Sequence, residues 1–203
     1  MSRYIITHSL LSSWMYLLKC NPYEDMTTER DAFHEFMAVL RREPTETTEA
    51  MAKGIEFEDL VTDILEGDAD RDHRWYSAAA KVADKVKGGV LQFKAYRNIM
   101  VDGMEILLYG RLDVLKAGKV IDIKFSGRYD RGKFVDSTQH PVYLHLIPEA
   151  QAFTYLISDG NDVWTETYRR DETADVCVII SDFLAWLAEH GLLEIYKEKW
   201  AAR

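Results

Sequence analysis

Two aspartates and one lysine in a short predicted hairpin are the residues best suited to do chemistry. Asp113 lies in the first strand, and Asp122 and Lys124 lie two residues apart in the second. If the turn is centred on Ala117-Gly118, Asp113 stands directly opposite Asp122, with Cβ atoms about 4.5–5.5 Å apart. Like charges so placed are destabilising, and a divalent cation between the carboxylates would remove that cost. This spacing indicates a metal site, and a slip of one residue would abolish it.

The same register places Arg111 opposite Lys124, so a basic pair lies beside the acidic pair. A bound phosphate would offset the repulsion between these two cations. The alternative is a solvent-facing sheet surface, on which the two aspartates form ordinary salt bridges with Arg111 and Lys124. The hairpin alone leaves both interpretations open.

Three more polar residues fall where they could join the hairpin carboxylates. Glu58 lies at the edge of the apolar stripe of a helix predicted over Thr48–Leu65, so it can lean toward a sheet while the helix stays packed. A second helix is predicted over Pro148–Ser158, and the spacing of four puts Gln151 and Tyr155 on one face of it. Taken singly, each has an ordinary structural explanation: Glu58 as a surface glutamate, and Tyr155 as a half-buried core tyrosine with Gln151 as its polar neighbour.

In chain order these residues form one pattern: Gly54-x-x-x-Glu58, Gly110-x-x-Asp113, Asp122-Ile123-Lys124 and Gln151-x-x-x-Tyr155. The pattern resembles the PD-(D/E)XK nuclease superfamily, and within it the RecB-like and phage-type exonuclease branch. The segments Ser9–Trp14 and Cys20–Tyr23 resemble the opening helix and Cys-Pro of RecB-like nucleases, so the resemblance spans roughly residues 9–170. Leu112 stands where the family has a proline.

The resemblance implies an active site that uses Mg²⁺ or Mn²⁺ to hydrolyse DNA. The metal ligands would be Glu58, Asp113, Asp122 and the backbone carbonyl of Ile123. Lys124 would be the catalytic lysine, and Gln151 and Tyr155 would orient the active site or the DNA end. Some RecB-like nucleases carry an iron–sulfur cluster on four cysteines, but this chain has only Cys20 and Cys177, so no such cluster is expected.

Charge is unevenly distributed along the chain, whose net charge is -9. Residues 21–73 hold 16 acidic and 5 basic side chains, whereas residues 74–133 hold 13 basic and 6 acidic ones. A basic middle in an acidic chain is typical either of a polyanion-binding surface or of a solvated strand-and-loop region. The candidate contacts to DNA phosphates are Arg111, Arg128, Arg131 and Lys133, with Tyr129 and Phe134 interleaved for base stacking; a solvated loop is the alternative.

The order of predicted elements indicates a mixed α/β fold. Helices are expected at Ser9–Lys19, Glu29–Arg41, Thr48–Leu65, Ser77–Lys85, Pro148–Ser158, Thr173–Glu189 and after Gly191, and strands at Val90–Val101, Ile106–Lys116, Lys119–Phe125 and Asp162–Arg169. The resemblance implies a restriction-endonuclease-like αβββαβ core with a mixed central sheet flanked by helices. We expect one domain over 1–203, with an N-terminal helical part (1–50), a catalytic core (51–170) and C-terminal helices (171–203).

The functional expectation is a metal-dependent DNA exonuclease, such as one of a phage or prophage recombination and repair module. Three alternatives remain: an endonuclease of the same superfamily, a non-catalytic module that binds DNA ends or a partner on the nuclease fold, and an acidic interaction protein. DNA is the expected partner, and the ring-forming phage exonucleases make a homo-oligomer or a recombination partner protein compatible with the resemblance. The sequence shows no signal peptide or membrane span, so we expect a cytoplasmic protein without a membrane partner.

Overall fold

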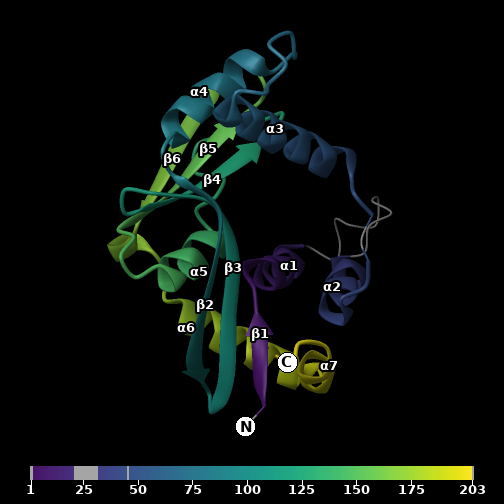
Figure 1. The fold of residues 1–203 in the computed structure, drawn as a ribbon. Coiled ribbons are helices and arrows are strands. Elements are labelled where there is room, and N and C mark those ends of the chain that lie inside the picture. Colours follow the sequence, from purple (N-terminus) through teal and green to yellow (C-terminus); the bar gives the residue numbers. More distant parts are fainter. Residues whose placement is uncertain (1, 21–31, 45, 203) are drawn as a thin grey trace.

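The computed structural model describes residues 2–20, 32–44 and 46–202, which form a mixed α/β fold around a six-stranded sheet (Figure 1). The strands are β1 (Arg3–Ile6), β2 (Val90–Val101), β3 (Met104–Lys116), β4 (Lys119–Phe125), β5 (Ala152–Ser158) and β6 (Val163–Arg169). They are ordered β1-β3-β4-β5-β6, and β2 pairs with β3. The pairs β1–β3 and β4–β5 are parallel, and the other pairs are antiparallel.

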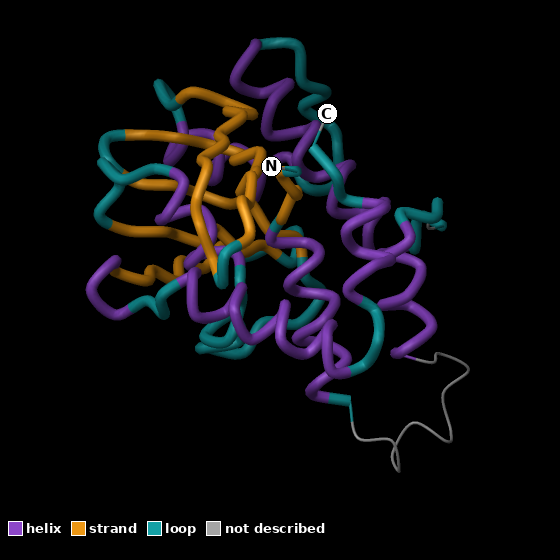
Figure 2. Tube along the Cα trace, turned by 90° about the horizontal axis from the view of Figure 1, so that it is seen from below, coloured by secondary structure: helices purple, strands orange, loops and turns teal. Residues whose placement is uncertain are grey.

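Helices lie around this sheet, and the strands gather in one part of the molecule when it is seen from below (Figure 2). The helices are α1 (His8–Lys19), α2 (Ala32–Arg41), α3 (Glu49–Glu66), α4 (Tyr76–Val86), α5 (Gln139–Leu146), α6 (Val176–Glu189) and α7 (Leu193–Lys199). The boundaries of α3 show why these segments are helical. The Thr48 side chain accepts a hydrogen bond from the N–H of Met51 at one end, and Gly67 adopts a left-handed conformation (φ 90°) at the other.

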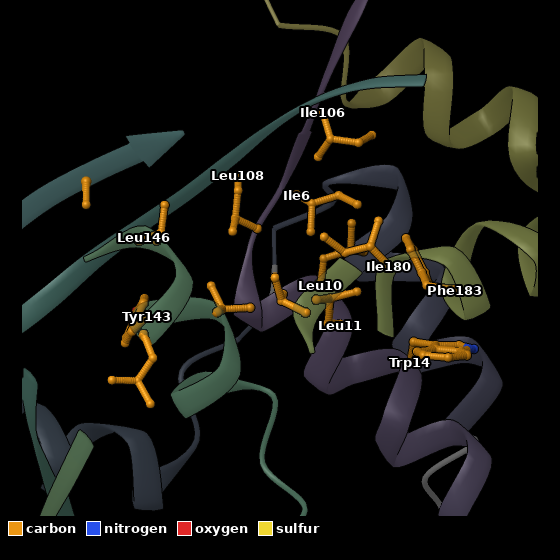
Figure 3. Close-up of a cluster of buried hydrophobic side chains, with 14 of the residues drawn as sticks. Ile6, Leu10, Leu11, Trp14, Ile106, Leu108, Tyr143, Leu146, Ile180 and Phe183 are labelled. Atoms are coloured by element: carbon orange, nitrogen blue, oxygen red, sulfur yellow. The ribbon is translucent and has the colours of Figure 1, made fainter. Parts of the chain in front are cut away.

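Two hydrophobic clusters hold the helices on the sheet. In the larger one, Leu10 and Leu11 of α1 and Phe183 of α6 pack with Ile106 and Leu108 of β3 (Figure 3). In the smaller one, α3 and α4 contribute Phe57, Val61 and Val82, which pack with Ile121 and Ile123 of β4. The middle of strand β4, from Val120 to Ile123, is therefore buried, and Asp122 lies inside the protein.

The hairpin between β3 and β4 has the register that the sequence predicts. Its turn residues Ala117 and Gly118 have φ values of 48° and 71°, as a two-residue type I′ turn requires. The pairs are Lys116–Lys119, Leu115–Val120 and Val114–Ile121. Pairing ends there, because the rest of β4 pairs with β5 alone. The expected oppositions of Asp113 with Asp122 and of Arg111 with Lys124 are therefore both wrong, although the register of the turn is as predicted.

Strand β3 is irregular at Asp113. It pairs with β2 from Val90–Leu115 to Val101–Met104, but the pair Gln92–Asp113 is missing, and Gln92 has a φ of 51°. In a regular strand, Leu112 and Val114 would share one face. Here Leu112 packs in the larger cluster and Val114 in the smaller one. Asp113 thus occupies the step at which β3 changes its buried face.

The predicted helix over Pro148–Ser158 is wrong, because this segment contains strand β5. All seven of its residues are buried, since β5 lies between β4 and β6, so it lacks the alternation by which an exposed strand is recognised. The preceding segment, for which no regular element was expected, forms α5. Strand β1 was also not predicted. The other predicted helices and strands are confirmed where the structure describes them, and residues 29–31 of the second predicted helix lie outside the described residues.

Among the described residues, no single helix is long and apolar enough to cross a membrane. The segments Arg170–Glu189 and Leu193–Lys199 reach the required length and apolar composition together, but they are bent by 116°.

Candidate active site

Asp122 is the centre of the polar cluster in the middle of the sheet. Its side chain, in β4, is buried, with 3% of the residue exposed. The side-chain amide of Gln139, the first residue of α5, donates a hydrogen bond to Oδ1 of Asp122. Nζ of Lys124 lies 2.9 Å from Oδ2, which accepts no hydrogen bond of ordinary geometry from the described residues. The structure thus brings Asp122 and Lys124 together, as the sequence indicates.

Asp113 is held against β4 by a hydrogen bond to the backbone. The N–H of Ile123 donates to its Oδ2 at 2.9 Å, next to the point where β3 and β4 stop pairing. Burial and, after it, the charges of Asp122 and Glu58 together raise the pKa of Asp113 from 3.8 to about 8. Asp113 is therefore protonated at pH 7 in this arrangement, because burial and its acidic neighbours disfavour its charge.

Glu58 approaches the same region from α3, on the opposite layer from α5. Phe57 and Leu60, its neighbours on the helix, are buried in the smaller cluster, which fixes the helix and leaves Glu58 half-buried at its edge. Burial raises the pKa of Glu58, and the charge of Asp122 adds to this effect. Three carboxylates from α3, β3 and β4 therefore influence one another electrostatically.

Two basic side chains complete the cluster. Burial opposes the charge on Lys124, but the attraction of Asp122 outweighs it, so the pKa of Lys124 is raised and the side chain stays an ammonium. His8, at the start of α1, is largely buried, and burial followed by the charge of Lys124 lowers its pKa to about 4. The ring of His8 packs edge-on against Tyr143, with centroids 5.4 Å apart. His8 is thus neutral at pH 7, with an imidazole in the candidate site.

The acidic side chains of the cluster have the donor atoms that a divalent cation needs. All three acidic ligands offer oxygen, which Mg²⁺ and Mn²⁺ prefer, and their mutual repulsion would be relieved by a bound cation. In the described parts of the chain, however, no three His, Cys, Asp or Glu side chains already lie close enough to form a closed metal-binding group. The ammonium of Lys124 neutralises Asp122 in this arrangement. The chemistry of the residues fits a cation, and their side chains would have to converge to bind it.

Gln151 and Tyr155 do not form the predicted pair on a helix. Gln151 is exposed at the far end of β4 from the site, where its N–H donates to the carbonyl of Gly118. Tyr155 lies beside Asp122 on β5, but it is fully buried and its ring stacks on Phe134 with centroids 4.4 Å apart. Tyr155 is a core residue beneath the site, and Gln151 does not belong to the site.

Two residues that the sequence analysis missed, Gln139 and Tyr143, have the expected spacing of four on a real helix. Gln139 binds Asp122, and the hydroxyl of Tyr143 donates to the backbone carbonyl of Arg111 at 3.0 Å. They tie α5 to the two strands that carry the aspartates. Their spacing was visible in the sequence, as Gln139-x-x-x-Tyr143. His8 had no comparable signal, because only the packing of α1 brings it to the site.

A cavity of about 320 Å³ opens beside the cluster, between α1 and the segment that leads into α5. Its lining includes His8, Lys19, Lys124, Lys133 and Gln139. Lys19 forms an ion pair with Asp136 at 2.8 Å across the cavity lining. Three lysines therefore line a hollow of mixed polar and apolar character next to the acidic cluster, and their charges suit a bound anion.

The other predicted DNA contacts are spread over the surface. Arg111 is exposed on β3, and Lys133 donates to Oγ of Ser126 at 2.8 Å beside the 320 Å³ cavity. Arg128 forms a surface ion pair with Asp130 at 3.0 Å. Arg131 lies elsewhere, in a cavity of about 680 Å³ along β6. Only Arg111 and Lys133 thus adjoin the site.

The two aromatic residues expected to stack on DNA are engaged within the protein. The hydroxyl of Tyr129 donates to Glu166 at 2.6 Å, and its ring packs on Trp164 with centroids 5.4 Å apart. Phe134 stacks on Tyr155. Both rings are half-buried and line cavities, so stacking on DNA bases stays a prediction.

Comparison with known proteins yields a shared fold and no family. No family model and no curated protein matches the sequence. Among solved structures, the crystal structure of SSO0001 is similar, with a TM-score of 0.53 and 16% sequence identity over 92% of this chain and 76% of that chain. At this identity the similarity shows the fold alone, so the function has to be argued from the site.

Proposed function

We propose that this protein is a metal-dependent deoxyribonuclease of the PD-(D/E)XK superfamily, and an exonuclease of its RecB-like and phage-type branch. One observation carries the proposal: Asp122 is buried between Lys124 and Gln139 while Asp113 is fastened to the adjoining backbone N–H. Three acidic groups and a lysine with shifted pKa values gather at one place in the fold, which supports a functional site there.

The order of elements supports the same proposal. Helix α3, strands β2, β3 and β4, helix α5 and strand β5 occur in the chain order αβββαβ that the resemblance implies, with the additional helix α4 between α3 and β2. The carboxylates lie on α3, β3 and β4, and the Gln-x-x-x-Tyr spacing lies on α5. The single-domain description and the placement of the catalytic core in residues 51–170 are part of this proposal.

The residues have distinct roles in the proposed hydrolysis. Glu58, Asp113, Asp122 and the carbonyl of Ile123 would hold Mg²⁺ or Mn²⁺, which supplies charge neutralisation at the phosphate and an activated water. Lys124 keeps its proton, so its ammonium stabilises the negative charge that develops on the scissile phosphate. Gln139 holds the Asp122 carboxylate in one orientation, and Lys133 offers a further contact to the DNA backbone.

The test is digestion of three substrates: end-labelled linear duplex, single-stranded DNA and closed circular DNA. Each is incubated with Mg²⁺, with Mn²⁺ and with a chelator. We expect metal-dependent loss of the linear substrates alone, with the label reporting the polarity. Nicking of the circle would replace the exonuclease with an endonuclease of the same site. Absence of cleavage by folded protein under all conditions would contradict the proposal.

A further inference from the structure

Strands β2 and β3 have one face that no helix of the described chain is seen to cover. Gly110 marks the covered face: a Cβ placed on it would lie 2.3 Å from the Tyr143 ring of α5, and its partner across the strands, Ala95, is 6% exposed. Because side chains alternate along a strand, the adjacent pair Tyr96–Tyr109 points to the opposite face. Tyr96 is 75% exposed there.

This outer face is aromatic and basic. Its residues are the cross-strand pairs of β2 and β3 that flank Tyr96 and Tyr109, and we call them the outer β2–β3 face: Lys94–Arg111, Tyr96–Tyr109 and Asn98–Leu107. Lys94 and Arg111 are both exposed. At its far end, Arg3 of β1 reaches across β3 and donates to Oδ1 of Asn98 at 3.2 Å. The face thus carries Lys94, Arg111 and Arg3 around a pair of tyrosines, with one acidic residue, Glu105, beside Arg3 at the far end.

The outer β2–β3 face leads into the candidate active site. Arg111 is two residues from Asp113 on β3, and its backbone carbonyl accepts the hydrogen bond from Tyr143 of α5. A chain lying along β3 would pass the tyrosine pair, then the Lys94–Arg111 pair, and then reach the carboxylates. Successive side chains on one face of a strand are about 6.6 Å apart, so neighbouring pairs offer alternating stacking and charged positions.

We propose that the outer β2–β3 face is a binding surface that guides single-stranded DNA to the carboxylates. The inference rests on the proposed function, which it deepens. Tyrosine rings on an open sheet stack on unpaired bases, whereas duplex DNA hides its base faces and offers only phosphates. Lys94, Arg111 and Arg3 neutralise the backbone phosphates on either side of the stacked bases. The occupant is therefore single-stranded DNA rather than a duplex or an acidic protein.

Binding is measured by the fluorescence anisotropy of a labelled oligothymidylate of about 16 nucleotides, in chelator so that no cleavage occurs. Tyr96→Ala is expected to weaken binding roughly tenfold, since one stacked base is lost, while Tyr96→Trp retains it. Val178→Ala removes a similarly exposed apolar side chain (58% exposed) from α6 and is expected to change nothing. The affinity for a blunt duplex is expected to be the same in Tyr96→Ala and the unmodified protein.

Charge is tested separately by the salt dependence of binding. Lys94→Gln is expected to lower the slope of log affinity against log salt by about 0.7, the value for one phosphate contact to a single strand. Lys81→Gln, an exposed lysine of α4, is the matched control and is expected to leave the slope unchanged. Equal slopes for Lys94→Gln and the unmodified protein would contradict the inference.

The results separate this inference from the proposed nuclease activity. Cleavage of DNA with equal single-strand affinity in Tyr96→Ala and the unmodified protein would overturn the binding surface and leave the nuclease standing. If single-stranded DNA binding depends on Tyr96 but no DNA is cleaved, the binding surface stands and the nuclease proposal is overturned. If Tyr96→Ala instead converts a dimer to a monomer in sedimentation, with unchanged affinity for DNA, the face joins two copies of this chain and the inference is wrong.

Discussion

The side-chain amide of Gln139 donates a hydrogen bond to Oδ1 of Asp122, which ties the first turn of α5 to the centre of β4. Both residues are buried, so this oxygen has no ready access to water as a substitute partner. The contact explains how a carboxylate remains in one orientation inside the sheet. It also makes α5, rather than the segment after Pro148, the helix that organises the candidate site.

Replacing Gln139 tests this role. Gln139→Met keeps the side-chain length but leaves Oδ1 of Asp122 unpaired, and we expect a loss of about 1–3 kcal/mol in the free energy of unfolding. We also expect nuclease activity to fall. Urea denaturation and DNA digestion measure the two effects. Gln151→Met is the control, because Gln151 is exposed and remote from Asp122; equal losses in both variants would contradict the assignment.

Arg170 holds the end of α5 and the segment that follows it. Its guanidinium donates to the carbonyls of Leu144, Ile147 and Ala150 at 2.6–2.9 Å. Arg170→Ala leaves these acceptors without their charged donor, and we expect a loss of at least about 2 kcal/mol in urea denaturation. Arg169→Ala breaks the exposed ion pair with Asp171 and should leave the free energy of unfolding nearly unchanged. If Arg170→Ala destabilises the protein no more than Arg169→Ala does, Arg170 does not hold this segment in place.

Close packing at Gly110 sets the distance between β3 and α5. Gly110→Ala places a methyl group 2.3 Å from Cε1 of Tyr143, so the helix must shift, and we expect a destabilisation of about 1–3 kcal/mol. Gly54→Ala is the contrasting change, since the added methyl meets no described atom within 4 Å in the middle of α3. It should stabilise by about 0.5–1 kcal/mol. Melting temperatures of both variants check this, and a neutral Gly110→Ala would rule out the packing account.

The stability of the protein should depend on the protonation of His140. Its ring is 4% exposed, stacks on Tyr168 of β6, and has Tyr155 of β5 and Glu166 of β6 as its titratable neighbours. Burial lowers its pKa from 6.5 to about 4, and Glu166 opposes this only in part. The unfolded chain therefore takes up the proton first as the pH falls from 6.5 to 4, and stability is lost across this window.

The expected loss from His140 is at most about 1.4 kcal/mol per pH unit. His8 titrates in the same window, so the contribution of His140 is isolated by comparing His140→Gln with the unmodified protein. The difference in unfolding free energy between pH 6.5 and 4.5 should be smaller in the variant. The same decrease in both proteins would show that His140 is not the group responsible.

The sequence predicted the hairpin of the site well because local chemistry determines it. Ala117-Gly118 suits a two-residue turn, and the turn fixes the register of Val114 with Ile121. The sequence could not show that pairing stops at this point. Farther along β3, Glu105–Leu108 pair instead with β1, which lies about a hundred residues away in the sequence, and the N–H of Ile123 binds Asp113.

The sequence analysis missed helix α5 and predicted a helix where strand β5 lies, and these two errors have a different cause. Pro141 and Pro148 made the first segment look irregular, but Pro141 lies in the first turn of α5, where a backbone N–H has no helical partner to lose. The apolar run of β5 has no period of two because both of its faces are buried, and such a run does not distinguish strand from helix. Strand β1 is short and pairs with a segment about a hundred residues away, so no local signal marks it.

The proposed nuclease activity depends on the ammonium of Lys124. It is tested by the rate at which Lys124→Ala degrades end-labelled linear DNA in Mg²⁺. The matched control is Lys119→Ala, which removes an exposed lysine from the same strand. Circular dichroism verifies that both variants fold. We expect robust cleavage by the unmodified protein and by Lys119→Ala, and no cleavage above background by Lys124→Ala. Cleavage by Lys124→Ala at the rate of the unmodified protein would contradict this role of Lys124.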